Sequence, residues 1–122
     1  MKRDMDLVRE ILILIEDDVC AFGAGHGEAR LAFPEADVME HLRLMEQAGL
    51  IEVASHPLSG PIYVRGLTWT GHDFLDTVRD PEVWKRTKEG ASKMGGWTFG
   101  LLKDLGTAYL KHVAKERLGL DI

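Results

Sequence analysis

The chain has 122 residues, 45% of them hydrophobic, 29% charged and 7% aromatic, a balance that predicts a folded globular domain and excludes a disordered chain. Its one cysteine excludes an internal disulfide and its short aliphatic runs exclude a membrane-spanning helix, so we expect a cytoplasmic protein without membrane contact. The formal net charge of −5 argues against a protein that coats nucleic acid along its whole surface.

Residues 4–19 are predicted to form the first helix, because their apolar residues recur at steps of three and four. Asp4 is expected to cap this helix, and the acids of its first turn exclude a secretory signal there. The next segment holds three glycines within residues 23–27, which predicts a loop. A short extended piece is expected at residues 29–33.

A second helix is predicted from Pro34 to Ala48, with Pro34 at its first position and Gly49 as its left-handed stop. Two β-prone runs follow at 50–54 and 62–69, separated by the segment SHPLSGP, whose prolines and glycine favour a turn. Together they predict a β-hairpin.

Thr70 is expected to cap a third helix, with Asp73 as the acid of a capping box. The pair Asp80-Pro81 then interrupts or restarts the helical pattern.

A loop is predicted at residues 90–96, and a last, amphipathic helix begins at Trp97 or Thr98. The tryptophans are expected to lie in the core. They are Trp69, Trp84 and Trp97.

The end of the second helix and the start of the third resemble those of a winged-helix domain. The residues concerned are Leu42, Met45, Ala48, Gly49, Leu50 and Ile51, then Leu67, Thr68, Trp69, Thr70 and Gly71. This resemblance implies an α+β fold of helix, short strand, helix, hairpin wing and helix, with a C-terminal amphipathic helix added. We expect a winged-helix-like domain over 1–80 and a helical extension over 81–122. The 14 residues between Val19 and Pro34 leave little room for a scaffold helix before the recognition helix.

Three longer motifs resemble one bacterial family. They are MKRDMDLVREIL at the start, HLRLMEQAGLI in the middle, and LTWTGHDFLDTVRD followed by Trp84. The motifs are similar to those of the domain of unknown function 2513 family (DUF2513), small bacterial proteins often found in phage or prophage settings. The resemblance extends over nearly the whole chain and implies a winged-helix-like fold with a role in DNA binding or regulation.

The charge is unevenly distributed along the chain. Residues 1–82 carry 7 basic and 16 acidic groups, whereas residues 83–122 carry 8 basic and 4 acidic groups. The predicted function is that of a non-enzymatic, DNA-binding transcription regulator of phage or prophage type, acting on double-stranded DNA. Direct contacts are expected from Arg43, Gln47 and Arg65, and contacts to the phosphate backbone from Lys85, Arg86, Lys88 and Lys93.

The last helix predicts the two-fold interface of a homodimer, because its apolar residues share one face. This interface is expected to contain Leu101, Leu105, Tyr109 and His112. An alternative function is a protein–protein interaction module, in which an acidic face of the second helix meets a basic protein partner. The acids of that helix are Glu35, Asp37, Glu40 and Glu46.

Groups suited to catalysis or metal binding are scattered. His72 and Asp76 lie four residues apart, but the chain has no paired-ligand motif, and His26 and His56 fall in other elements. The glycine-rich segment lacks the Gly-Lys-Ser/Thr of a phosphate loop. We therefore expect no catalytic residue, no metal and no cofactor. A metal-dependent enzyme is the remaining alternative, and it requires His72 and Asp76 to converge with another histidine.

Overall fold

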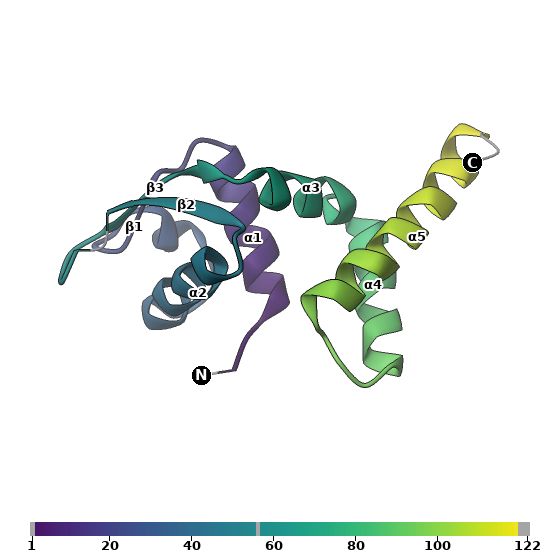
Figure 1. The fold of residues 1–122 in the computed structure, drawn as a ribbon, viewed down its shortest axis with the longest axis horizontal. Helices are drawn as coiled ribbons and strands as arrows, with labels where there is room; N and C mark the ends of the chain where they lie inside the picture. Colours follow the sequence, from purple (N-terminus) through teal and green to yellow (C-terminus); the bar gives the residue numbers. More distant parts are fainter. Residues whose placement is uncertain (1, 56, 120–122) are drawn as a thin grey trace. The chain divides into compact units, whose positions relative to one another are not determined.

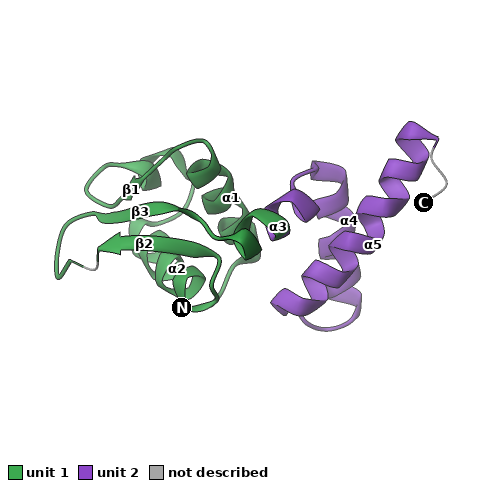
Figure 2. Cartoon of the chain, turned by 45° about the horizontal axis from the view of Figure 1, so that its top comes forward, with its two compact units in different colours: residues 1–73 green, residues 74–122 purple. Residues whose placement is uncertain are grey.

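The computed structural model describes residues 2–55 and 57–119, so that His56 of the predicted hairpin tip lies outside the described residues. The chain divides into two compact units, residues 1–73 and 74–122 (Figure 2). The division falls inside the third helix. The predicted domain boundary at residue 80 stays a prediction.

Unit 1 begins with α1 (Met5–Glu16), which ends three residues before the predicted Val19. The carboxylate of Asp4 accepts from the N–H groups of Asp6 and Leu7 at 2.9 and 3.4 Å, which confirms the predicted cap. The Asp4 N–H itself donates to Nε2 of His41 at 2.8 Å. Because Nε2 accepts, the His41 proton is on Nδ1, which donates to the carbonyl of Asp37 at 2.8 Å. This histidine, 1% exposed, therefore joins the start of α1 to α2.

The first strand is not at 29–33, as the sequence predicted, but at β1 (Ala21–Phe22). The prediction was wrong because Glu28 folds back onto the preceding loop. Its carboxylate accepts from the N–H groups of Gly23 and Gly25, and this contact holds η1 (Gly27–Arg30) as a 3₁₀ turn where the strand was expected.

The second helix, α2 (Glu35–Gln47), is one residue shorter at each end than the predicted Pro34 to Ala48. Pro34 has an extended ψ of 140° and is therefore the residue before the helix, not its first residue. Gly49 has a φ of +75°, which confirms the left-handed stop.

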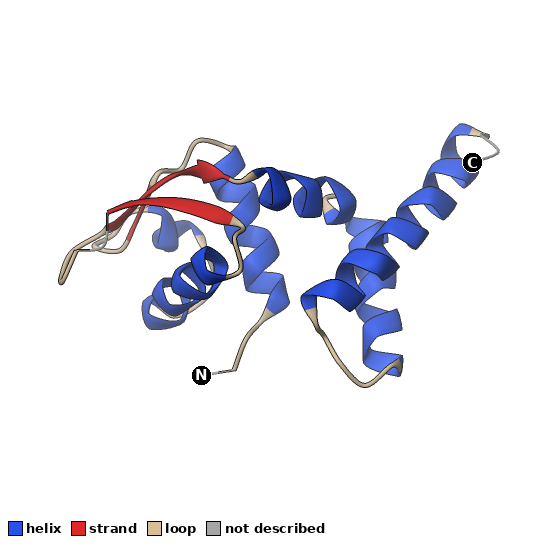
Figure 3. Ribbon diagram, viewed as in Figure 1, coloured by secondary structure: helices blue, strands red, loops and turns tan. Residues whose placement is uncertain are grey.

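The predicted hairpin is confirmed as β2 (Ile51–Ser55) and β3 (Ile62–Leu67). It joins β1 in an antiparallel sheet of order β1-β3-β2 (Figures 1 and 3). Helix α1 packs against β3 and α2, and α2 packs against β2. Residues 62 and 64 are buried while residues 63 and 65 are exposed, so the outer face of β3 carries Tyr63 and Arg65.

The third helix, α3 (Trp69–Val78), is capped by Thr68 and not by Thr70. The Thr68 hydroxyl accepts from the N–H of Gly71 at 3.0 Å and donates to the carbonyl of Gly49 at 2.5 Å. The cap lies two residues earlier than predicted because the backbone N–H of Thr68 is also tied, at 3.1 Å, to the carbonyl of Leu50. The helix thus starts where β3 ends.

Unit 2 contains α4 (Pro81–Lys93) and α5 (Phe99–Leu118), which lie side by side and are joined by a short loop (Figure 1). Asp80 caps α4 and Pro81 is its first residue, as the predicted restart requires. The predicted loop at 90–96 is wrong at its start, because α4 continues through Gly90 and ends at Lys93.

The unit 2 core is built on aromatic and aliphatic side chains. The rings of Phe74 and Phe99 lie 4.8 Å apart between centroids. Trp84 is 4% exposed, as expected for a core residue.

The core prediction is wrong for Trp69, which belongs to unit 1. This residue is 88% exposed because it stands at the first position of α3 with its face toward solvent.

Candidate functional site

The predicted direct DNA contacts lie on exposed surfaces of unit 1. Arg43 and Gln47 are exposed on α2, opposite the buried Val38 and Leu42, and Arg65 is exposed on β3. Nη1 of Arg43 lies 3.4 Å from Oε2 of Glu40. An exposed pair of this kind contributes only about 0–1 kcal/mol, so the Arg43 guanidinium is able to exchange its partner for another anion.

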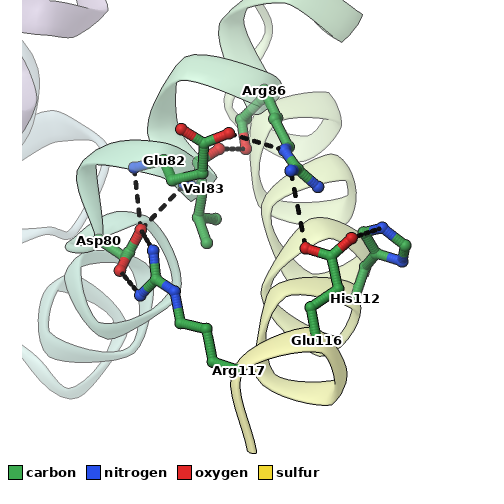
Figure 4. Close-up of polar contacts among 8 residues, drawn as sticks. Asp80, Glu82, Val83, Arg86, His112, Glu116 and Arg117 are labelled. Carbon is green, nitrogen blue, oxygen red and sulfur yellow. Dashed lines mark hydrogen bonds and ion pairs between the residues drawn. The ribbon is translucent and has the colours of Figure 1, made fainter. Parts of the chain in front are cut away.

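Two of the predicted site residues meet in an ion-pair network of unit 2 (Figure 4). Arg86 projects from α4, with Nε 3.0 Å from Oε1 of Glu82 and Nη2 3.7 Å from Oε2 of Glu116. Nε2 of His112 lies 2.9 Å from the other oxygen of Glu116. The charge of Arg86 is therefore largely neutralised within the unit. Arg86 is a weaker candidate for phosphate contact than its lysine neighbours.

Asp80 joins the two long helices of unit 2 (Figure 4). Its carboxylate caps α4 by accepting from Glu82 and Val83 at 2.9 and 3.2 Å, and it also pairs with the guanidinium of Arg117 near the end of α5. The hydrogen bond from Arg117, helped by the N–H groups of the cap, outweighs burial and lowers the pKa of the Asp80 carboxyl.

We expect Asp80→Ala to lower the free energy of unfolding by about 1–2 kcal/mol, because it removes the cap and the ion pair together. Asp80→Asn keeps a capping oxygen and is expected to cost less than half as much. The stabilisation by Asp80 is fully present above pH 3.8, the ordinary pKa of its carboxyl group. It is lost as the pH falls through the lower pKa that the group has in the folded protein. Urea unfolding of both variants at pH 7 and pH 3 measures these effects, and equal losses in the two variants at pH 7 would contradict the role of the cap.

Three lysines of the predicted backbone contacts share one outward face of α4. Lys85, Lys88 and Lys93 line an open groove of about 550 Å³, with Glu89 and Ser92 from the same helix and Trp97 from the loop that follows. The sequence prediction included the lysines and missed the groove. The spacing of residues 85, 88, 92 and 93 along one helix face was the signal available for it.

The predicted dimer interface includes residues that pack inside unit 2. A Cβ placed on Gly90 of α4 would lie 2.9 Å from the hydroxyl of Tyr109 and 3.4 Å from Cδ1 of Leu105. These two side chains therefore face α4 of the same chain. His112 is engaged by Glu116, and Leu101 is half-buried. The homodimer stays a prediction.

The remaining candidates do not assemble into a site. Across the described residues, no three His, Cys, Asp or Glu side chains form a group able to hold a metal ion. His72 and Asp73 are exposed on α3, and Asp76 pairs with Arg79 at 2.5 Å. In the parts of the chain that the structure describes, no helix has the length and hydrophobicity needed to cross a bilayer.

The glycine-rich loop after α1 has the form of an anion-binding turn, but its anion comes from the chain itself. The carboxylate of Glu28, 6% exposed, accepts from Gly23 and Gly25 at 2.6 and 2.8 Å. Nδ1 of His26 lies 2.7 Å from the carbonyl of Gly23. The loop is therefore a closed structural element with these amides already occupied.

Comparison with known proteins identifies the family. A family model described as "Hypothetical protein (DUF2513)" matches residues 2–97. A relative from Haemophilus influenzae, described as an uncharacterized protein, is 36% identical over 90 residues, which cover 72% of this chain and 76% of the relative. No solved structure matches the chain. The family resemblance predicted from the three sequence motifs is confirmed, and the chain belongs to the domain of unknown function 2513 family.

Proposed function

We propose that the protein is a winged-helix DNA-binding protein that acts in the cytoplasm, as a homodimer, as a non-enzymatic transcription regulator of phage or prophage type. The order of elements supports the winged-helix assignment. Helix α1 is followed by β1, a short helical turn, α2 and the hairpin β2–β3, and β1 pairs with the return strand β3 in the sheet order β1-β3-β2. In this arrangement α2 is the recognition helix and the hairpin is the wing.

The short turn η1 fits the position of the scaffold helix. It occupies four residues, Gly27–Arg30, between β1 and α2, and it contacts both of them. The limited chain length between α1 and α2 explains why a 3₁₀ turn replaces a longer helix. The carboxylate of Glu28 holds this turn against the loop that precedes it.

The single observation that carries the proposal is the exposure of Arg43 and Gln47 on α2 in this topological position. Arginine pairs with the O6 and N7 atoms of guanine, and glutamine with the N6 and N7 atoms of adenine, in the major groove. Arg65 on the outer face of β3 supplies a direct contact from the wing. The lysines of α4, Lys85, Lys88 and Lys93, supply contacts to the DNA backbone.

Titration of the protein with random duplex DNA at increasing salt tests the proposal. We expect binding at low ionic strength that weakens as salt rises, and Arg43→Ala and Arg65→Ala are each expected to weaken it because each removes one positive charge from the interface. The control is Lys111→Ala on the exposed surface of α5, which changes the net charge equally and is expected to have little effect. Absence of duplex binding at low ionic strength would refute the proposal.

A second candidate function is a protein-interaction module. Its support is the charge of α2, where four acids stand against one arginine and the arginine is paired with Glu40. A basic protein surface would complement this helix, whereas duplex phosphates would repel it. Pull-down from a host lysate with wild type and Glu40→Lys separates the two functions. Capture of a basic protein that is lost in Glu40→Lys favours the module, and recovery of nucleic acid alone favours the regulator.

A further inference from the structure

The groove on α4 combines positive charge with an aromatic wall. Helix α4 turns Val83, Thr87 and Ala91 into the core of unit 2, so that the opposite face, which carries the lysines, is directed to solvent. Residues 85 to 93 extend over about 12 Å of helix, which gives room for more than one phosphate group. The net charge of the lining residues is positive, because three lysines outnumber Glu89.

Trp97 forms the wall of the groove that does not belong to α4. It lies in the loop between α4 and α5, directly before Thr98, whose hydroxyl caps α5 by accepting from Leu101 at 3.1 Å. The indole Nε1 donates to Oγ of Ser92 at 3.2 Å. The edge of the ring is thereby tied to α4, and the side chain is held half-buried beside the lysines.

Positive charge and an aromatic surface in one groove match the two parts of a nucleotide. Lysines attract the phosphate groups, and an indole face stacks on a base. In a duplex both faces of each base are stacked on neighbouring base pairs, whereas a base of a single strand has a face available for stacking on a side chain. We propose that the groove binds single-stranded nucleic acid, with a base stacked on Trp97 and the flanking phosphates held by Lys85, Lys88 and Lys93.

This inference rests on the proposed function, from which it takes nucleic acid as the ligand. It adds that the α4 lysines bind a single strand. The two share the α4 lysines and can be separated by the residues that they do not share. Duplex recognition is assigned to Arg43, Gln47 and Arg65 of unit 1, and single-strand binding to Trp97 of unit 2 together with the lysines.

Fluorescence anisotropy with a labelled oligothymidine of 12 nucleotides and a labelled duplex of 12 base pairs tests the inference. We expect Trp97→Ala to weaken oligothymidine binding about tenfold or more, which is the range for loss of one stacked base. Trp97→Phe keeps an aromatic face and is expected to restore much of the affinity. The matched control is Trp69→Ala, because Trp69 is 88% exposed and lies outside the groove.

Charge reversal tests the lysines separately. Lys85→Glu and Lys93→Glu are expected to weaken oligothymidine binding, whereas Lys111→Glu on α5 changes the net charge equally and is expected to leave it nearly unchanged. Three phosphate contacts predict a slope of about −2 for the logarithm of the binding constant against the logarithm of salt concentration. The lysine variants lie on a solvent-exposed face, so this arm stays informative if Trp97→Ala fails to fold.

Several results would overturn the inference. One is no binding of oligothymidine at low salt, and another is an equal loss of duplex and single-strand binding in folded Trp97→Ala. Displacement of oligothymidine by polyglutamate at a similar concentration of charge would identify the groove as a site for acidic peptides instead. Duplex binding that requires Arg43, without single-strand binding, refutes this inference and keeps the proposed function. Single-strand binding that requires Trp97, without duplex binding, supports this inference and refutes the proposed duplex recognition.

Discussion

Replacement of Gly71 by alanine is expected to lower the free energy of unfolding by about 3 kcal/mol. A Cβ at this position would lie 2.0 Å from the carbonyl oxygen of Leu50, far inside contact distance. Backbone must move to relieve the overlap, because the same oxygen accepts from the N–H of Thr68 at 3.1 Å. The N–H of Gly71 is itself bonded to the Thr68 hydroxyl. Urea unfolding followed by far-ultraviolet circular dichroism measures the loss.

Gly100→Ala is the matched control for this prediction. Gly100 lies in the first turn of α5, and a Cβ there would meet nothing within 4 Å. Alanine is favoured over glycine in a helix by up to about 1 kcal/mol, so this variant is expected to be as stable as the wild type or more stable. Equal stability of Gly71→Ala and wild type would contradict the close approach of α3 to the Leu50 carbonyl.

Glu28→Gln is expected to lower the free energy of unfolding by about 2 kcal/mol, the scale of a hydrogen bond to a charged acceptor. The carboxylate accepts from two N–H groups, those of Gly23 and Gly25, with one oxygen for each. Glutamine has a single oxygen, so its NH₂ group would face one of these donors. Thermal and urea unfolding at pH 7 measure the effect. The control is Glu35→Gln. The carboxylate of Glu35 is exposed, and its hydrogen bond to the backbone, from the N–H of Ala24, is long at 3.5 Å. A loss below about 0.5 kcal/mol is expected for this variant.

The Glu28 contact also predicts a dependence of stability on pH. Burial alone would raise the pKa of the Glu28 carboxyl, but the N–H groups of Gly23, Gly25 and Glu28 itself, together with His26, outweigh burial and lower it. The stabilisation is therefore fully present above pH 4.5, the ordinary pKa of this carboxyl group. It is lost as the pH falls through the lower pKa that the group has in the folded protein. We expect the difference in stability between wild type and Glu28→Gln to shrink over this range. A difference that stays constant from pH 7 to pH 3 would contradict the assignment.

The predictable parts of the fold were those set by local patterns. Apolar spacing located α1 and α2, the Asp4 cap and the Gly49 stop followed from residue type alone, and the pair Asp80-Pro81 indicated the restart at α4. The errors arose where contacts with residues distant in the sequence determine the local structure. Thr68 and Thr70 are equivalent as capping residues in the sequence, and only the contacts of Thr68 with Gly49 and Leu50 select it.

The candidate site shows the same limit. Composition located the basic segment of α4, but it did not distinguish Arg86 from the lysines around it. Glu116, thirty residues away in the chain, takes part in neutralising Arg86, and no local pattern indicates that partner. Trp97 was expected in the core because aromatic residues usually are, whereas the loop before α5 leaves it half-buried at the groove.

The contacts of Thr68 close the hairpin at its base. Its N–H and its hydroxyl donate to the carbonyls of Leu50 and Gly49, so the two strands are joined at the end opposite the turn. The pairing of β2 with β3 is therefore anchored at this end as well as at the turn. Residues 57–60 at the tip are exposed, and lengthening a loop costs only about 0.6 kcal/mol for each doubling. The tip is thus the part of unit 1 where residues can be inserted or exchanged, for example to carry a label, at little expense to the fold.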